Sequence, residues 1–447
     1  MGGHLLLGRV SRWCGRCARR GQGPSEVRTL LSRLLGFGTA PMIVAIVPLV
    51  VLPVASRVEG PGGWAAIGTG QALGALCAMI SSYGWNVSGG ARVALAADDD
   101  ARRSIYAHSF WTRLTVFVIS ATVMAAVAAA LVDPEFAVVA ALAVYASGLT
   151  GLTMSWYAVG TGRARLVLWY EAVPIAAFTA ASAGVMQLTG ALISYPVMMI
   201  AGTFIGLGAL NLHLYRRPVP PLHLADVRRS FRYNLPLASA DGIGGSYTTA
   251  PIPIAQAVVG TQAAAELTSA DKFYRIGLTA ILVTGNTLQK WVLEITWAEG
   301  RVRRHGVALL AHFAVGMIGL IVLIFLGPTL TAWLLGEAVA PSPALFPAYG
   351  VTFLIISLTT PLIRNILVPA QRNRVVLIAI VSSASAGLPA MLLLGTTLGS
   401  TAIVWGLALS EVVVLSIVAT AAAREVRSQM RAATAHSVVR AEEEGRG

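Results

Sequence analysis

Long apolar segments separated by short polar connections are the feature that most limits how this chain can fold. Hydrophobic residues make up 56% of the 447 residues and charged residues only 12%, against about 25% charged in an average soluble domain. A helix of about 20 apolar residues crosses the hydrocarbon core of a membrane, and lipid offers no partner to an unpaired backbone group. The chain is therefore predicted to be an all-α polytopic membrane protein.

Twelve segments have the length and composition of a membrane-spanning helix. The predicted spans are residues 36–56, 64–86, 113–132, 136–157, 166–187, 190–212, 234–258, 263–289, 306–326, 344–368, 375–395 and 400–423. Six of them precede a basic, proline-containing connection and six follow it, which predicts two six-helix lobes around a central cavity. The expected units are a basic tail (1–35), an N-terminal lobe (36–212), a linker (213–233), a C-terminal lobe (234–423) and a second tail (424–447).

Positive charge is distributed unevenly between the two sides of the predicted membrane. Most of the 33 Lys and Arg residues lie in the two tails and the even-numbered loops, whereas the odd-numbered loops hold only Arg57. This positive-inside pattern predicts a multi-pass protein of the plasma membrane with both termini in the cytoplasm. The same placement accounts for the net charge of +13, so we expect membrane lipids as partners and no nucleic acid.

A short sequence recurs at an offset of 200 residues, and its two copies lie in the first predicted span of each lobe. The recurring residues are Pro53, Ala55, Val58 and Gly60, which return as Pro253, Ala255, Val258 and Gly260. Because each lobe contains an even number of spans, the two repeats are expected to have the same orientation in the membrane. Internal repeats of this kind predict a two-lobed transporter. Beyond the shared glycine, residues 68–72 are uncharged, whereas residues 268–272 carry charge.

The eighth predicted span holds a cluster of charges inside the membrane. Asp271, Lys272 and Arg275 lie within two turns of one helix, where an ionisable side chain costs roughly 2.5–3.5 kcal/mol on insertion scales. Asp271 and Arg275 are four residues apart and therefore share a helix face. We interpret Lys272 and Arg275 as substrate-binding residues and Asp271 as an ion-coupling residue. A purely structural pair between Asp271 and Arg275 is the alternative.

Further ionisable residues lie in other predicted spans. Asp241 belongs to the glycine-rich stretch 240–245 of the seventh span, where a weakened helix beside a carboxylate suits a cation or proton, so Asp241 is a second predicted ion-coupling residue. Arg364, in the inner part of the tenth span, is a third predicted substrate-binding residue, and a position at the cytoplasmic interface instead of the cavity is its alternative. An ion pair between Asp241 and Arg364 is the alternative. Glu171, Glu411 and His312 are interpreted mainly as structural residues.

Motifs of catalysis and of metal or nucleotide binding are not evident. Neither of the two lysines, Lys272 and Lys290, belongs to a Walker A loop. The acidic run 98–100 is followed at once by arginines, which favours a solvated charge run. Cys14 and Cys17 form a lone CxxC in the first tail, for which no metal is expected. We predict no enzymatic activity, no catalytic residue, no cofactor and no metal site.

Several motifs resemble those of one transporter family. Residues 264–273 read Ala-Ala-Glu-Leu-Thr-Ser-Ala-Asp-Lys-Phe, which is similar to the small-residue run and Ala-x-Lys of the polysaccharide (Wzx-type) flippases. Residues 233–237 resemble the Leu-Pro entry to the seventh helix of that family, and residues 162–165 and 371–374 resemble its turns after the fourth and tenth helices. The resemblance covers residues 36–423. The chain lacks the Tyr of the Gly-x-Tyr that usually precedes the Ala-x-Lys.

The resemblance implies a flippase of the multidrug/oligosaccharidyl-lipid/polysaccharide exporter superfamily. Its substrate would be a polyprenyl-diphosphate-linked oligosaccharide, moved by alternating access for polysaccharide biosynthesis, with coupling to a cation or proton. A diphosphate needs fixed positive charge in a cavity, which agrees with the cations of the eighth span. A cation-coupled multidrug antiporter of the same fold and a membrane glycan polymerase are the alternatives.

Overall fold

The computed structural model describes residues 47–216, 219–220, 224–294 and 298–444, and all regular secondary structure within these residues is helical. The predicted basic tail (1–35) with Cys14 and Cys17 lies outside the described residues, as does the first part of the first predicted span. The prediction of an all-α polytopic membrane protein is confirmed.

The described part of the first half starts with a helix at Val47–Val58. It continues with α3 (Gly60–Ser82), α4 (Trp85–Ala94), α5 (Asp99–Leu131), the 3-10 turn η1 (Pro134–Phe136), α6 (Ala137–Gly148), the 3-10 turn η2 (Leu149–Leu152), α7 (Ser155–Thr161), α8 (Ala164–Val167), the π-helical η3 (Leu168–Ala172), α9 (Val173–Thr189) and α10 (Ser194–Tyr215). The second half contains α11 (Leu224–Thr249), α12 (Pro251–Val258), α13 (Thr261–Leu293), α14 (Ala298–Leu335), the 3-10 turn η4 (Glu337–Val339), α15 (Leu345–Pro361), the π-helical η5 (Leu362–Leu367), α16 (Asn373–Leu398) and α17 (Ser400–Glu444).

Nine helical segments among the described residues are long and apolar enough to cross a membrane. The combination of α11 and α12 is not among them, and neither is α13, which carries Asp271, Lys272 and Arg275. The helix Val47–Val58 is apolar but shorter than a membrane span within the described residues. The exact number of twelve spans therefore stays a prediction.

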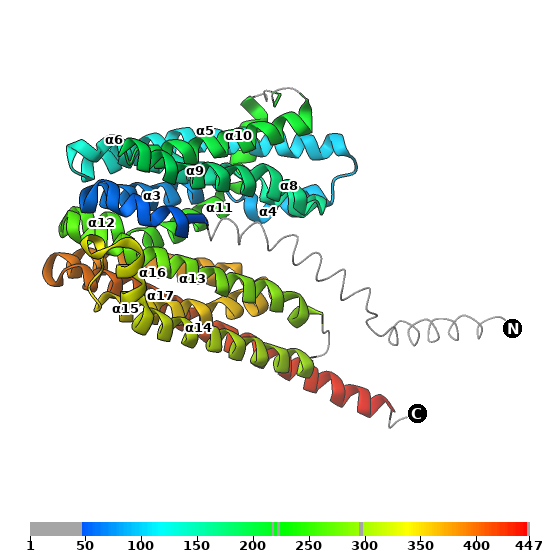
Figure 1. The fold of residues 1–447 in the computed structure, drawn as a ribbon. Helices are drawn as coiled ribbons and strands as arrows, with labels where there is room; N and C mark the ends of the chain where they lie inside the picture. Colours follow the sequence, from blue (N-terminus) through cyan, green and yellow to red (C-terminus); the bar gives the residue numbers. More distant parts are fainter. Residues whose placement is uncertain (1–46, 217–218, 221–223, 295–297, 445–447) are drawn as a thin grey trace, which may run out of the picture.

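The helices form two groups that follow the order of the chain (Figure 1). Helices α3–α10 lie together on one side and α12–α17 on the other, and α11 lies between them, against α3 and α5 as well as α16. In the first group α3 packs against α5 and α6, and in the second α14 packs against α15 and α16 against α17. Helix α3 joins the two groups because it also contacts α11, α12 and α13. The boundaries of the lobes at residues 212 and 234 stay a prediction.

The repeated sequence marks the same structural event in both halves. The helix Val47–Val58 ends before Gly60, which has φ +62°, and α12 ends before Gly260, which has φ +121°. Residues with a side chain rarely adopt such angles, so glycine is favoured at both positions. In each half a long helix, α3 or α13, starts directly afterwards. The repeat therefore specifies a helix end and the start of the next helix.

Helix α11 is continuous through residues 240–245, so the expected weakening of the helix at this stretch is wrong. Gly245 serves close packing instead, since a Cβ atom there would lie 2.7 Å from the sulfur of Met79 on α3. The helix breaks later, at Ala250. Pro251 follows, and a proline ring has no N–H to donate to a helical hydrogen bond.

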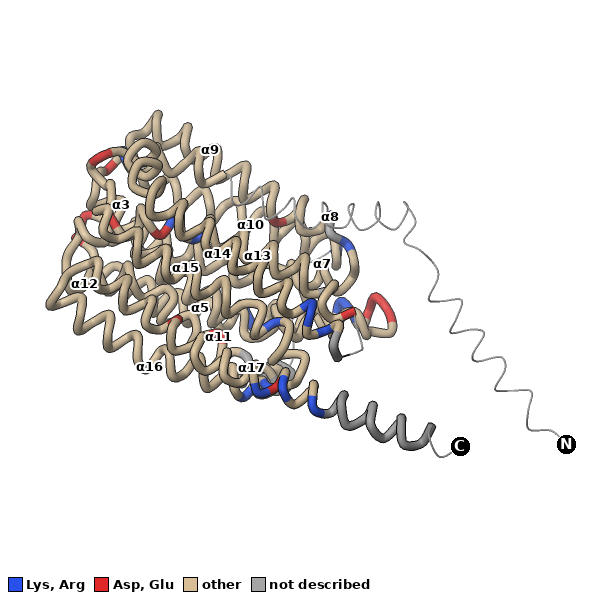
Figure 2. Tube along the Cα trace, turned by 90° about the horizontal axis from the view of Figure 1, so that it is seen from below, with Lys and Arg blue, Asp and Glu red and all other residues tan. Residues whose placement is uncertain are grey.

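Basic residues are concentrated at one end of the bundle. Figure 2 shows Lys and Arg gathered where α7, α8 and the far part of α17 lie, while few are found at the opposite end. This agrees with the uneven distribution of charge along the sequence. Which end faces the cytoplasm stays a prediction.

Candidate functional site

A cavity of about 250 Å³ lies between helices from the two halves of the chain. The first half contributes Gly68, Gln71, Ala72 and Ala75 from α3, Ser147 and Thr150 from the segment of α6 and η2, and Met199 from α10; the second half contributes Ile252 from α12 and Asp271, Lys272 and Arg275 from α13. Three of the predicted site residues are thus brought together at a single cavity.

Lys272 reaches across this cavity to the other half of the molecule. Its Nζ donates a hydrogen bond to Oε1 of Gln71 on α3. The Nε2 atom of Gln71 in turn donates to the hydroxyl of Tyr195 on α10, at 3.3 Å. The contacts of the Lys272 ammonium are therefore with a neutral amide, which satisfies one of its donors without cancelling its charge.

Asp271 and Arg275 form the ion pair that was the alternative interpretation of these residues. Nε of Arg275 lies 2.5 Å from Oδ2 of Asp271, and one terminal nitrogen of Arg275 donates to the carbonyl of Thr248 on α11 at 3.3 Å. The Asp271 side chain is only 8% exposed, whereas the Arg275 side chain is 36% exposed. The guanidinium therefore holds the carboxylate and still presents part of its surface to the cavity.

The two halves can approach closely here because of one glycine. Gly68 on α3 packs against Thr268 on α13, and a Cβ atom at position 68 would lie 1.8 Å from the threonine hydroxyl. These two positions are equivalent in the repeat, since their numbers differ by 200. One turn away, Nε1 of Trp64 donates to the hydroxyl of Ser269 at 2.9 Å, and both residues are fully buried. Small residues at helix contacts are the usual basis of such packing in membranes.

Arg364 does not line this cavity. It lies in η5 and donates hydrogen bonds to the side-chain oxygens of Asn286 at 2.6 Å and Gln289 at 3.1 Å, both on α13. Asn286 is eleven residues beyond Arg275, or about 16 Å along the helix. A role of Arg364 in substrate binding stays a prediction. Any such role would concern a site outside this cavity.

Asp241 contacts the first half of the chain rather than Arg364. Its side chain is hydrogen-bonded to Ser82 at the end of α3. Its role in ion coupling stays a prediction.

Glu411 is a buried acid in the same half, and the sequence led us to interpret it mainly as a structural residue. Glu411 on α17 is 5% exposed and is hydrogen-bonded to Tyr247 on α11. The only signal in the sequence was one acid in a long apolar span.

Reasoning from the sequence missed Gln71, which lines the cavity, and Tyr195, which accepts a hydrogen bond from it. Amide and hydroxyl side chains are common in apolar spans, so neither stood out. The repeat contained the one usable signal, since Gln71 occupies the position that Asp271 occupies in the second half.

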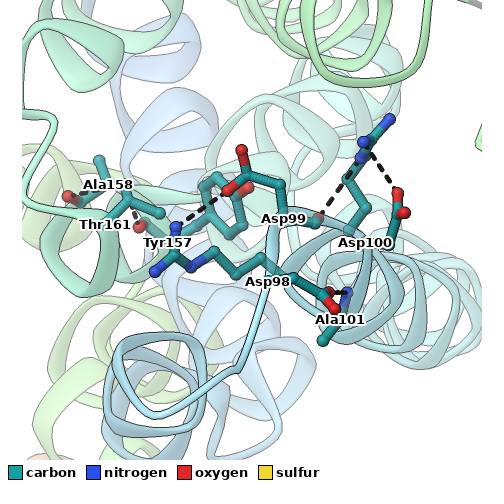
Figure 3. Close-up of polar contacts among 9 residues, drawn as sticks. Asp98, Asp99, Asp100, Ala101, Tyr157, Ala158 and Thr161 are labelled. Carbon is teal, nitrogen blue, oxygen red and sulfur yellow. Dashed lines mark hydrogen bonds and ion pairs between the residues drawn. The ribbon is translucent and has the colours of Figure 1, made fainter.

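The acidic run 98–100 serves local structure. Figure 3 shows Asp98 capping α5, where its carboxylate accepts from the backbone N–H of Ala101 at 2.7 Å. Asp99 pairs with Arg102 at 2.9 Å and Asp100 with Arg103 at 2.8 Å. Carboxylates at a helix N-terminus are favoured by its unpaired N–H groups. The interpretation of this run as solvated charge is consistent with these contacts.

The arrangement at the cavity can hold an anionic group. Two cations and one carboxylate face a space enclosed by both halves, which leaves an excess of one positive charge among the lining residues. Arg and Lys both bind phosphate oxygens, and Arg does so in a bidentate geometry. The cavity lies among helices of both halves, so a movement of one half against the other would change its shape.

Comparison with known proteins identifies the family and the fold. The family model described as "Polysaccharide biosynthesis protein" matches residues 35–287, which is more than half of the chain. A search of curated proteins gave no match.

Solved structures of several transporters share the fold. A multidrug resistance MATE family transporter of the MOP superfamily in an inward-facing conformation has a TM-score of 0.68 at 14% identity, with 89% of this chain and 99% of that chain covered. The lipid II flippase MurJ in an inward closed conformation has a TM-score of 0.62 at 9% identity, covering 90% and 91%. The eukaryotic MATE transporter AtDTX14 has a TM-score of 0.54 at 10% identity, covering 90% and 98%. At these identities the likeness establishes the fold alone.

Proposed function

The chain belongs to the polysaccharide biosynthesis protein family, and from that premise we propose that it is a flippase for a polyprenyl-diphosphate-linked oligosaccharide. It would move the head group of this lipid across the plasma membrane by alternating access, without catalysing a reaction on it. The fold is that of membrane transporters of the MOP superfamily, which supports transport in general. The choice of substrate rests on the cavity.

The observation that carries the proposal is the excess of positive charge in a cavity enclosed by both halves. A diphosphate has to leave water when it enters the membrane, and fixed cations compensate for the lost hydration. Lys272, held by the neutral Gln71, keeps its charge for the ligand. Arg275 is oriented by Asp271 and still exposes part of its guanidinium. The lipid tail would remain in the bilayer while the head group passes between the halves.

The two halves are linked at the ends of their helices near the odd-numbered connections. The Ser56 hydroxyl donates to the carbonyl of Leu335 at 2.8 Å, and the Arg57 guanidinium donates to the carbonyl of Leu334 at 3.2 Å. In alternating access these contacts would have to open for the cavity to face the other side.

We assign coupling to a cation or proton to Asp241 and Asp271. Glu411 is a further acidic group in the same half.

Replacement of both cavity cations tests the proposal. We expect Lys272→Ala combined with Arg275→Ala to abolish surface polysaccharide in the native host and to cause the lipid-linked precursor to accumulate in the inner leaflet. Arg374→Ala is the matched control, because it removes an exposed cation outside the cavity. It should leave surface polysaccharide unchanged.

The same experiment distinguishes the alternatives. If the double variant is fully expressed and makes normal surface polysaccharide, the cavity is not the substrate site. A multidrug antiporter would instead show changed resistance to cationic drugs with no accumulated precursor. A glycan polymerase would leave short glycan on the outer leaflet rather than precursor on the inner leaflet.

A further inference from the structure

A second and larger space lies on the second half of the molecule, away from the charged cavity. It is a groove of about 600 Å³ between α14, α15 with η5, and α17, within the range of about 300–1,000 Å³ typical of ligand pockets. Its walls are mostly aliphatic and include Leu309, Leu358, Leu362, Ile366, Leu415 and Ala419. It shares no helix with the charged cavity, so the flippase proposal gives it no role.

The groove is polar at one end only. His305 on α14, Asn365 on η5 and Arg427 on α17 line it, and their positions on these helices place them toward the basic end of the bundle. Leu309, Leu358 and Leu415 lie deeper along the same helices. The groove is therefore polar at the expected membrane surface and apolar toward the membrane interior, which is the polarity of a phospholipid molecule.

Asn365 is a buried polar residue that points to a ligand. Its side chain is 3% exposed, and its Oδ1 atom has no hydrogen-bond partner in the described structure. Nδ1 of His305, also on the groove, lacks a partner as well. Buried polar atoms are nearly always hydrogen-bonded. The π-helical turn η5 presents Asn365 to the groove, whereas the adjacent Arg364 bonds to α13, and π-helical turns are frequent at functional sites.

We propose that this groove binds an anionic glycerophospholipid of the leaflet at the basic end. An acyl chain would occupy the aliphatic part, the phosphate would lie beside Arg427, and a hydroxyl of the lipid head group would donate to Oδ1 of Asn365, next to His305. Charge complementarity selects an anionic lipid, because exposed Arg303 and Arg424 lie on the same helix ends as His305 and Arg427. Basic residues next to an anionic leaflet attract such lipids. The transported lipid is a weaker fit, since its diphosphate is assigned to cations on α13.

Lipid titration of the purified full-length protein tests the inference. Phosphatidylglycerol or phosphatidylcholine is added to the protein in a neutral detergent, and bound lipid is counted by native mass spectrometry. We expect retention of phosphatidylglycerol over phosphatidylcholine. Arg427→Gln should weaken the binding of phosphatidylglycerol about fivefold, the effect of one basic residue near an anionic surface. Ala419→Phe should fill the groove and abolish the binding of phosphatidylglycerol.

Matched controls lie on the same helix outside the groove. Ser416→Phe adds the same bulk on an exposed part of α17, and Arg431→Gln removes an exposed cation farther along it; neither should change lipid retention. Equal retention of the two lipids, or unchanged binding by Arg427→Gln, would overturn the inference. Preferential retention of polyprenyl phosphate over phosphatidylglycerol would also overturn the inference. A change of oligomeric state in Ala419→Phe, without loss of lipid, would show that a second copy of the chain covers the groove.

Discussion

The contact between Gly68 and Thr268 allows a sharp test of how the two halves meet. Replacing Gly68 by Ala would place its Cβ atom 1.8 Å from Oγ1, 2.6 Å from Cγ2 and 2.7 Å from Cβ of Thr268. Rotation of the threonine side chain does not relieve this overlap, because the Cβ atom of Thr268 stays where it is. Its hydroxyl is also held by a 2.7 Å bond to the carbonyl of Ala264. Helices α3 and α13 must therefore separate.

The expected cost follows from the size of this overlap. Overpacking of a well-packed contact typically costs about 1–3 kcal/mol of folding free energy, and an overlap that involves a Cβ atom belongs in the upper part of that range. The separation would also move Gln71 away from Lys272, since both lie one turn beyond the contact. We therefore expect Gly68→Ala to reduce thermal stability and transport together.

A double-mutant cycle measures this effect cleanly. Thr268→Gly removes all three of the closest atoms, at a cost of about 1 kcal/mol for a glycine inside a helix. In the Thr268→Gly background, Gly68→Ala should then no longer lower the melting temperature of the purified protein and should raise it slightly, because alanine favours a helix over glycine. Gly208→Ala on α10 is the control, because a Cβ atom there meets nothing within 4 Å, and it should melt at or slightly above the wild-type temperature, since alanine favours a helix over glycine.

Two results would refute this reasoning. If Gly68→Ala melts at the wild-type temperature, the two helices do not pack as closely as described. If Gly68→Ala destabilises the Thr268→Gly protein as much as it destabilises the wild type, the cost comes from another contact than the one with Thr268.

Three further predictions concern local structure and topology. Asp98→Ala should destabilise the protein by about 0.5–2 kcal/mol through loss of the cap on Ala101, whereas Asp98→Asn should retain most of the cap in the same thermal assay. Arg113→Met should greatly lower the yield of folded protein in detergent, since the fully buried guanidinium of Arg113 donates to backbone carbonyls that would lose their partner. In a background without native cysteines, Glu59→Cys should react with an impermeant thiol reagent on intact cells and Pro220→Cys should not, and the reverse reactivity would contradict the topology.

The fold was largely predictable from the sequence because the membrane leaves few choices. Apolar segments of span length must be helices in lipid, and nine of the predicted spans correspond to described helices that are long and apolar enough to cross a membrane. The glycine-rich stretch of the seventh span misled this reasoning. Glycine weakens an isolated helix, but at Gly245 the absence of a side chain allows contact with Met79 of α3. Tertiary packing outweighed local propensity there.

The candidate site was predictable only in part. Charges in an apolar helix are conspicuous, so Asp271, Lys272 and Arg275 could be recognised together. Their partner Gln71 carries no charge, and its nearness to Lys272 depends on where the two halves cross. The position of Arg364 could not be derived either, because depth in the membrane does not determine the face of a helix. The π-helical turn η5 adds a further rotation that the sequence does not reveal.

The difference between the repeats at the cavity has a physical reason if the substrate is a diphosphate. Gln71 occupies the position equivalent to Asp271 on the helix that faces α13. A symmetric pair of charged helices would place two cationic clusters on opposite walls of the same cavity of about 250 Å³. Like charges that face each other across so small a cavity repel strongly in a medium of low dielectric constant. An amide on α3 accepts a hydrogen bond from Lys272 without adding or removing charge. We infer that confining the charged residues to one half allows the empty cavity to close. The cavity still retains one excess positive charge for a phosphate group. Gln71→Glu should therefore favour the closed, empty state and weaken substrate binding, and a variant that transports as well as the wild type would contradict this account.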